Sequence, residues 1–455
     1  MSEFRSHKWI SSGEGKALNV HKVPSIFNPV AKNPCNLISI FGRARQGKSF
    51  LMNCLAGERE IFKISNEKDS CTQGIDISSK WLSLADFSRL DGGKHIGGRT
   101  EGIRIGFVDA EGQGDKDVSY DANLICPILL ASKCVIFNWK GDLQKDNILS
   151  TLGIMARAAK NIDSESTGST TSKFGHLHII FRDWQAVKTD EEAVFHALLG
   201  IEGTVEGTTR DIIRSDLLSS FESIKVWLFD PPSEYTKDLK QKLVFERTSD
   251  VFRTQVRSLR EALSQQLKEP TYLAGNVLTG RTYIPLTEQI ADALNNGRAV
   301  LPSSAYLNVI RHDLQNALST YRDHLRELSK YILDTHHFER EDQDRKWVDT
   351  VGAYFTLLRD PQYFSALSAT VTEQHNARVA GIVGGVGGVG GAAGSPVATI
   401  LSEYAAQTQE IHSSAEAQFL ALYAQQFTQW LMKARKAAEK AIENEMLLLE
   451  KALPL

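Results

Sequence analysis

The segment 42–49 constrains the fold more than any other part of this chain. It reads Gly-Arg-Ala-Arg-Gln-Gly-Lys-Ser, with an apolar run at 37–41 before it and a helix-favouring run at 50–55 after it. A strand, a glycine-rich loop and a helix in this order wrap the phosphates of a nucleotide, because glycine lets successive backbone N–H groups point inward. The pattern therefore predicts a nucleotide site at the carboxyl end of a buried strand.

The positions of this phosphate loop have expected roles. Lys48 is expected to reach the outer phosphates and the Ser49 hydroxyl to bind Mg²⁺, while the start of the helix adds its positive dipole end. The residues expected to surround the nucleotide here are Gly42, Arg45, Gln46, Gly47, Lys48, Ser49 and Phe50.

Short apolar runs rich in strand-favouring residues recur through the first half of the chain. They lie at 37–41, 103–108, 134–138, 176–181 and 224–229. Stretches with helical periodicity, such as 121–132 and 147–160, lie between them. Strands that alternate with helices predict an α/β fold in which a mainly parallel sheet is flanked by helices.

The strand signal stops at about residue 235, and an all-α region is expected to follow. Helices are expected at 245–267, 286–294, 303–331, 343–358 and 399–453. We expect an N-terminal extension at 1–20, a nucleotide-binding domain at 21–300, a helical domain at 301–378, a glycine-rich apolar segment at 379–398 and a long helix at 399–455.

The glycine-rich segment 379–398 carries no charged residue. Its length would span a bilayer, but glycine contributes little hydrophobicity and opposes an isolated helix. A flexible hinge between helices is the favoured interpretation. A tip that contacts a membrane, or a small-residue surface for helix packing, is the alternative.

Two further segments carry groups that a hydrolase for nucleoside triphosphates needs. The strand at 103–108 leads into Asp109-Ala110-Glu111-Gly112. Asp109 is expected to hold Mg²⁺ through water, and the Gly112 N–H to meet the γ-phosphate. In the polar loop 70–75, Thr72 is expected to reach Mg²⁺ with its hydroxyl and the γ-phosphate with its backbone.

Recognition of the base has to come from another segment. An Asn/Thr-Lys-x-Asp motif, the usual reader of guanine, is not present at a strand end, and residues 138–142 are close to it but wrongly spaced. The strand at 176–181 ends instead in Arg182-Asp183. A carboxylate there accepts from the guanine N1–H and amino group together, a pairing that adenine does not offer. Because the phosphate loop does not distinguish bases, an ATPase is the alternative.

Together these segments resemble the guanylate-binding protein and atlastin family of the dynamin superfamily. The resemblance covers about residues 20–310 and rests on 42–53, 72–75, 109–112, 182–183 and the stretch 275–302. It implies a GTPase that binds GTP or GDP with Mg²⁺ and dimerises through its nucleotide-binding face. It also implies that Arg45 acts as an arginine finger in cis and that Ser70 helps to position the attacking water.

The chain departs from the family pattern at three points. Ala110 stands where the family usually has threonine, and Gln113 stands where a leucine is common. In small GTPases a glutamine directly after this motif orients the attacking water, so Gln113 is expected to assist hydrolysis or else to face solvent as an ordinary switch residue. The third departure is the tail, which shows neither paired transmembrane helices nor a prenylation site.

Composition sets the remaining expectations. A formal net charge of -3 gives no support for a nucleic-acid partner. The five cysteines are scattered, and no secretory signal is visible, so we expect a cytoplasmic protein with free thiols. Association with a membrane stays open as an alternative.

Three functional interpretations fit these residues. The leading one is a GTPase whose nucleotide-driven dimerisation moves the C-terminal helices, and the set Arg45, Ser70, Thr72 and Glu111 favours it. The second is a slowly hydrolysing scaffold that binds partners under nucleotide control. The third is a membrane-remodelling protein that uses residues 379–398 as its contact.

Overall fold

The computed structural model describes most of the chain. The described residues are 4–12, 17–64, 74–93, 102–110, 112, 118–160, 174–185, 190–204, 207–233, 243–273, 276–298, 302–335, 362–383 and 396–452. The chain divides into two compact units, unit 1 (Met1–Val309) and unit 2 (Ile310–Leu455). Each unit is described by itself.

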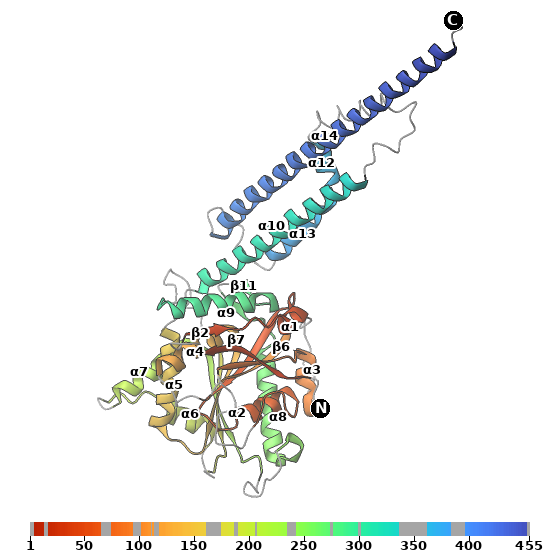
Figure 1. Cartoon of the computed structure of the whole chain (residues 1–455). Coiled ribbons are helices and arrows are strands. Elements are labelled where there is room, and N and C mark those ends of the chain that lie inside the picture. The colour runs from red at the N-terminus through yellow and green to blue at the C-terminus, as the bar shows by residue number, and fades with distance from the viewer. Residues whose placement is uncertain are drawn as a thin grey trace. The chain divides into compact units, whose positions relative to one another are not determined.

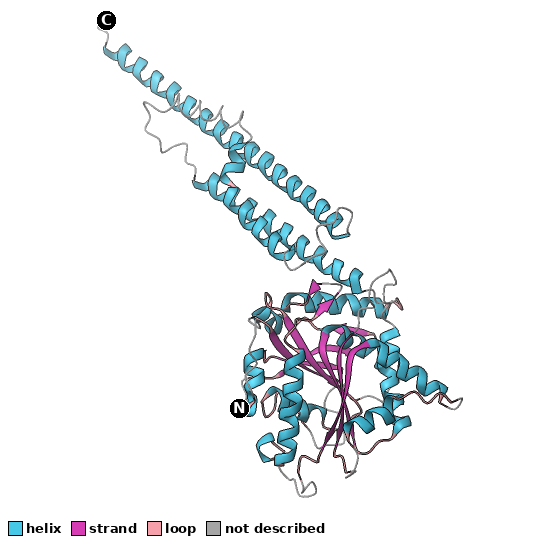
Figure 2. Ribbon diagram, turned by 180° about the vertical axis from the view of Figure 1, so that it is seen from behind, coloured by secondary structure: helices cyan, strands magenta, loops and turns pink. Residues whose placement is uncertain are grey.

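One mixed sheet forms the centre of unit 1 (Figure 2). Its strands are β1 (Ser6–Ser12), β2 (Leu18–Val20), β3 (Cys35–Phe41), β4 (Ile75–Ser78), β5 (Leu82–Ser83), β6 (Arg104–Ala110), β7 (Ser132–Lys140), β8 (Phe174–Arg182) and β9 (Phe221–Phe229). Their order is β2-β1-β4-β6-β3-β7-β8-β9, and β5 pairs with β6. The parallel part is β6-β3-β7-β8-β9, and the other pairings are antiparallel.

The parallel strands are those that the apolar runs predicted, so the α/β prediction is confirmed. β3 lies between β6 and β7, with Ile40 level with both Asp109 and Ile136. Every residue of β3 is buried, because helices cover both faces of the sheet. The carboxyl ends of β3, β6 and β7 therefore open toward the same edge.

Helices pack on both faces of this sheet (Figures 1 and 2). They are α1 (Pro24–Phe27), α2 (Lys48–Ala56), α3 (Leu84–Arg89), α4 (Val118–Ala131), α5 (Lys145–Lys160), α6 (Glu191–Leu199), α7 (Thr208–Ser220), α8 (Asp250–Gln266) and α9 (Gly280–Asn295). Short 3₁₀ helices lie at Asn28–Val30, Leu90–Gly92 and Phe245–Arg247. One core joins the sheet to α4, α5 and α9, and a second core joins it to α2, α3 and α8.

Two parts of unit 1 differ from the sequence prediction. β1 and β2 place residues 6–12 and 18–20 in the sheet, and their side chains are largely half-buried or exposed, which leaves little hydrophobic pattern to detect. The expectation that strands end near residue 235 is wrong, because β10 (Tyr272–Leu273) pairs with β11 (Asn276–Val277). Strands of two residues are too short to give a periodic signal.

Unit 2 is helical. Its helices are α10 (Pro302–Thr335), which begins in unit 1, α12 (Gln362–Leu367), α13 (Ala369–Val383) and α14 (Pro396–Ala452). A small core joins them, formed by Tyr321, Leu325, Phe364, Phe419 and Tyr423. The expected helix at 343–358 and the central part of the glycine-rich segment, 384–395, lie outside the described residues. Among the helices of the described part, none is both long and apolar enough to cross a membrane.

Candidate nucleotide-binding site

The phosphate loop has the backbone that its glycines predict. Gly42 has a φ of +139°, and a Cβ there would lie 2.2 Å from the carbonyl oxygen of Asn138. Gly47, with a φ of +75°, immediately precedes α2. Arg45 also has a positive φ, 62°, which is uncommon for a residue with a side chain. The surrounding structure therefore holds this loop in a conformation that a free chain would rarely adopt.

Side chains from α2 and β7 bind the carbonyl oxygens of the loop. The Lys48 ammonium, whose residue is 7% exposed, donates to the carbonyl oxygen of Arg43 at 3.0 Å. Asn138 at the end of β7 donates from Nδ2 to the carbonyl oxygen of Gln46 at 2.8 Å. Sequence reasoning had considered the segment around Asn138 only as a reader of the base. Its proximity to the loop is a result of the pairing of β3 with β7.

The two groups predicted to bind Mg²⁺ lie together. The Ser49 hydroxyl, in the first turn of α2, donates to Oδ2 of Asp109 at the end of β6, at 2.6 Å. Asp109 is fully buried. A hydroxyl and a carboxylate are hard oxygen donors of the kind that Mg²⁺ prefers, so the residues present fit this ion. Thr72, the third predicted ligand, lies outside the described residues.

Gly112, just after β6, lies against the phosphate loop. A Cβ on Gly112 would lie 2.2 Å from Cα of Ala44, so only glycine allows this approach. This contact brings the end of the Asp109–Gly112 motif onto the phosphate loop. Four other predicted residues, Ser70, Thr72, Glu111 and Gln113, lie outside the described part of the chain.

Arg182 is not the surface residue that an isolated Arg-Asp pair would suggest. It is 5% exposed, and its Nη1 donates to the carbonyl oxygen of Gly47 at 3.3 Å. The guanidinium carbon lies 5.8 Å from the ring centroid of Phe50 and 5.3 Å from that of Phe252. Burial lowers the pKa of Arg182, while the neighbouring Asp183 carboxylate opposes this shift. Arg182 therefore connects the end of β8 to the phosphate loop and stabilises their relative position.

Asp183 presents a carboxylate beside Arg182. It has a φ of +58°, and its Oδ2 lies 3.2 Å from the Lys140 ammonium. Its Oδ1 is buried without a hydrogen-bond partner among the described residues. A buried carboxylate oxygen without a partner is costly, and the N–H groups of a guanine would satisfy it.

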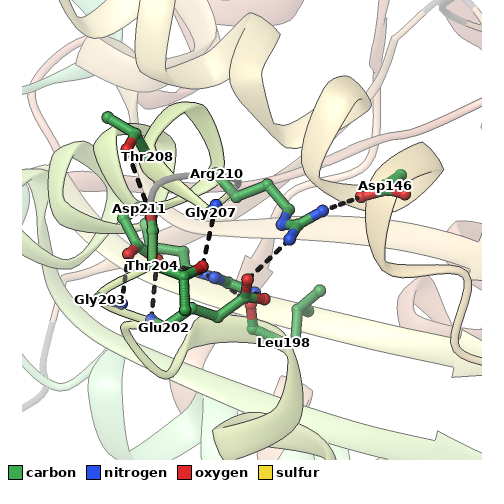
Figure 3. Close-up of polar contacts among 10 residues, drawn as sticks. Asp146, Leu198, Glu202, Gly203, Thr204, Gly207, Thr208, Arg210 and Asp211 are labelled. Carbon is green, nitrogen blue, oxygen red and sulfur yellow. Dashed lines mark hydrogen bonds and ion pairs between the residues drawn. The ribbon is translucent and has the colours of Figure 1, made fainter.

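A second charged cluster, at the start of α7, serves as a contrast (Figure 3). The fully buried Arg214 donates to Glu202, Asp211 and the carbonyl oxygen of Leu198. Arg210 donates to Glu202 at 2.7 Å and to Asp146 at 3.0 Å. The bonds from Arg210 and Arg214 lower the pKa of Glu202. Each guanidinium here binds carboxylates of the protein itself, which fits a structural cluster that fixes the loop between α6 and α7.

The described site residues gather at the carboxyl ends of neighbouring strands. Gly42, Arg45, Gln46, Gly47, Lys48, Ser49 and Phe50 follow β3, Asp109 and Gly112 lie at the end of β6, and Arg182 and Asp183 lie at the end of β8. The Phe50 ring packs against Phe252 and under Arg182, so its side chain belongs to the core. Sequence reasoning missed Phe252 and Lys140, which approach only through the folding of distant segments.

Comparison with known proteins places the chain. The family model described as guanylate-binding protein, N-terminal domain, matches residues 17–270. The chain belongs to the guanylate-binding protein family. It is 25% identical to guanylate-binding protein 5 of Mus musculus over 316 residues, which cover 65% of this chain and 50% of that protein. It is 23% identical to guanylate-binding protein 1 of Homo sapiens over 318 residues, or 64% of this chain and 51% of that protein.

A third relative extends the match. Guanylate-binding protein 1 of Mus musculus is 23% identical over 367 residues, which cover 72% of this chain and 60% of the relative. The chain spans about half the length of the curated relatives it matches. The resemblance that the motifs indicated is thus confirmed at the level of the family.

Proposed function

We propose that this chain binds guanine nucleotides with Mg²⁺ and hydrolyses GTP. The observation that carries the proposal is the arrangement at the end of β8, where Arg182 binds the phosphate loop and the adjacent Asp183 keeps one carboxylate oxygen without a hydrogen-bond partner in the described part of the chain. Arg182 is therefore fixed to the phosphate loop, while the Asp183 carboxylate is available to a base. Family membership and the geometry of the loop support the same conclusion.

The residues that would hold the metal ion are Ser49, Asp109 and Thr72. When bound, Mg²⁺ neutralises charge on the β- and γ-phosphates. The protein's own contribution is to hold the Ser49 hydroxyl and the Asp109 carboxylate in contact. Lys48, at the start of α2, supplies the positive charge that the phosphates need.

For hydrolysis we assign the main role to Arg45. Its side chain is exposed and its backbone lies inside the loop, so the guanidinium can turn over the β- and γ-phosphates. Such a charge contributes on the order of a thousandfold or more to the rate. Ser70 and Gln113 are assigned to positioning of the attacking water. Thr72, Glu111 and Gly112 are assigned to contacts that form around the γ-phosphate.

The proposal extends to assembly. Two copies dimerise through the nucleotide-binding face when GTP is bound, and hydrolysis moves the C-terminal helices, for membrane remodelling, membrane fusion or host defence. Residues 379–398 are the segment that we assign to peripheral membrane contact. A slowly hydrolysing scaffold under nucleotide control is the second candidate, and the burial of Arg182 and Asp109 around the loop is equally suited to it.

A matched pair of arginines separates these candidates. Arg45→Ala is expected to lower the rate of GTP hydrolysis about a thousandfold. The control is Arg43→Ala, because Arg43 is exposed in the same loop but stacks on Trp139 at 5.3 Å. Equal rates for the two variants would support the scaffold. Equal binding of ATP and GTP by the unmodified chain would overturn the guanine assignment.

Three more measurements address the finer assignments. Single-turnover GTP cleavage by Gln113→Ala tests the role of Gln113, and an unchanged rate would remove it. Light scattering on the apo, GDP, non-hydrolysable GTP and transition-state-mimic states tests dimerisation. A monomer in all four states would contradict the proposed assembly. Sedimentation with liposomes compares the full chain with a chain that lacks residues 379–398. Equal binding of the two would show that this segment is not the membrane contact.

A further inference from the structure

The last turns of α14 differ from the rest of that helix. Earlier in α14, Ile400, Tyr404, Phe419, Tyr423 and Phe427 are buried against unit 2. From residue 435 to residue 451, every side chain is exposed. The end of α14 extends past the end of α10 in both views (Figures 1 and 2). These turns therefore form a helix surface that the described part of unit 2 does not cover.

This surface carries more large apolar side chains than a solvated helix needs. Ile442 is 61% exposed, Met446 58% and Leu449 63%, and Met432, Leu447 and Leu448 are exposed to a similar degree. An exposed apolar cluster of this kind is typical of an interaction site. Charged residues flank it, so the surface has the composition of an interface between helices.

A heptad pattern that includes two of these apolar residues, Ile442 and Leu449, runs along this surface. Leu431, Arg435, Ala438, Ile442, Glu445 and Leu449 succeed one another at alternating steps of four and three residues. This spacing places them on one face of the helix, as in the seam of a coiled coil. The seam contains one basic and one acidic residue, Arg435 and Glu445, and they lie at equal distances on either side of residue 440.

The two halves of the terminal segment have opposite charge and size. Residues 432–440 contain four basic side chains and one acidic side chain, whereas residues 441–450 contain three acidic side chains and no basic one. The first half carries alanines at 434, 437 and 438, whereas Met446 and three successive leucines lie in the second half. Each half is thus complementary to the other in both respects.

We propose that two copies of this chain pair in antiparallel orientation through the end of α14. In this register Arg435 faces Glu445 of the second copy, and Ala438 faces Ile442 of the second copy. Leu431 then faces Leu449 of the second copy. Because of the two-fold symmetry, this apolar pair forms at each end of the seam. A parallel pair would place Arg435 against Arg435 and Glu445 against Glu445, so the charges select the antiparallel orientation.

The pair is expected to be weak and transient. Its contact involves about five helical turns from each copy, so the buried area falls at the low end of specific interfaces. The charged layer in the seam sets register and orientation, and the apolar layers supply the attraction. Arg435 also lies 2.9 Å from Glu439 on its own helix, which places a compensating charge beside that carboxylate.

Sedimentation equilibrium without nucleotide tests the pairing on the full chain. Because the seam residues from Arg435 to Leu449 are exposed, substitutions there leave the fold of unit 2 intact, which circular dichroism can verify. The unmodified chain is expected to dimerise reversibly with concentration, and Arg435→Glu or Glu445→Arg is expected to weaken dimerisation about tenfold or more. The double variant, and an equal mixture of the two single variants, are expected to restore it.

Two controls make the result specific. Lys436→Glu and Glu443→Lys change charge by the same amount outside the seam, and they are expected to leave dimerisation nearly unchanged. Orientation is tested by mixing Leu431→Cys with Leu449→Cys, which are expected to form a disulfide together but not separately.

Three outcomes would overturn the pairing. The first is a monomer at all accessible concentrations, and the second is a dimer unaffected by reversal in the seam. The third is a monomer that binds vesicles of phosphatidylcholine and phosphatidylserine through the same residues. Omitting nucleotide keeps this test separate from dimerisation through the nucleotide-binding face.

Discussion

The phosphate-loop edge of unit 1 and the core of unit 2 both contain buried polar groups, but of different kinds. At the loop, Lys48, Asp109 and Arg182 are buried charged residues. In unit 2 the buried polar groups include two tyrosines and a histidine that pair as neutral groups. The Tyr404 hydroxyl lies 2.9 Å from Nε2 of His375, and the Tyr321 ring stacks on His375 with centroids 4.1 Å apart.

This difference distinguishes a ligand-binding site from a structural core. Burying a charge costs far more free energy than burying a neutral group that is hydrogen-bonded. Folding alone does not require charges at the end of β3 and β8, whereas an anionic ligand does. The ring cluster of unit 2 has its hydrogen-bond partners within the protein, and it therefore contributes to stability without any ligand.

The largest expected effect separates two buried lysines of unit 1. Lys48→Ala is expected to lower GTP affinity by at least about a hundredfold, because the phosphates lose a buried cation. Lys80 is equally buried but donates to the carbonyl oxygen of Ala56 and to Glu58. Lys80→Ala is therefore expected to lower stability and leave affinity unchanged. Titration of each variant with a fluorescent GTP analogue measures its affinity, and equal losses of affinity in the two variants would contradict the distinction.

A smaller effect concerns pH and the buried histidine of unit 1. Trp227 donates to Nδ1 of His178, and Nε2 lies 2.7 Å from Gln266. Burial lowers the pKa of His178 to about 4, so the unfolded chain takes up a proton first as pH falls below 6.5. Stability is therefore full above pH 6.5 and is lost toward pH 4.

The expected loss between pH 7.5 and pH 5 is on the order of 2 kcal/mol of unfolding free energy. Denaturant unfolding at both values, followed by hydrogen exchange of the peptides around His178, measures it. In His178→Gln this part of the pH dependence is expected to disappear. An equal slope in the variant and the unmodified chain would assign the acid sensitivity to other groups.

The smallest expected effect lies in unit 2. Tyr404→Phe removes one neutral hydrogen bond to His375 and is expected to cost about 1 kcal/mol of stability. GTP affinity should not change, because the ring cluster is distinct from the phosphate loop. The control is Tyr331→Phe, since Tyr331 is 67% exposed. A change in nucleotide affinity caused by Tyr404→Phe would contradict the distinction between the nucleotide site and the core of unit 2.

The sequence predicted the parallel strands because helices cover both faces, which leaves continuous apolar runs such as β3. It also predicted the position of Asp109 and Asp183, since Asp109 lies at the end of such a strand and Asp183 directly follows another. The antiparallel strands β1 and β2 gave no comparable signal because many of their side chains stay half-exposed.

Contacts between distant segments were beyond the sequence alone. Phe252 reaches Arg182 only because α8 packs under β8 and β9, and the two residues are far apart in the chain. The ring cluster of unit 2 combines α10, α13 and α14 in the same way. Local periodicity predicts each of these helices but not which of their side chains meet.

The central claim is that Asp183 reads guanine beside a phosphate loop braced by Arg182. Asp183→Asn tests it most directly, because an asparagine amide pairs with the N1–H and the 2-oxo group of xanthine instead of the two donors of guanine. The control is Asp142→Asn, which alters an exposed carboxylate in the 138–142 segment. The account predicts that only Asp183→Asn weakens GTP binding, by at least about a hundredfold, and gains binding of xanthosine triphosphate. Unchanged GTP affinity in Asp183→Asn would contradict it.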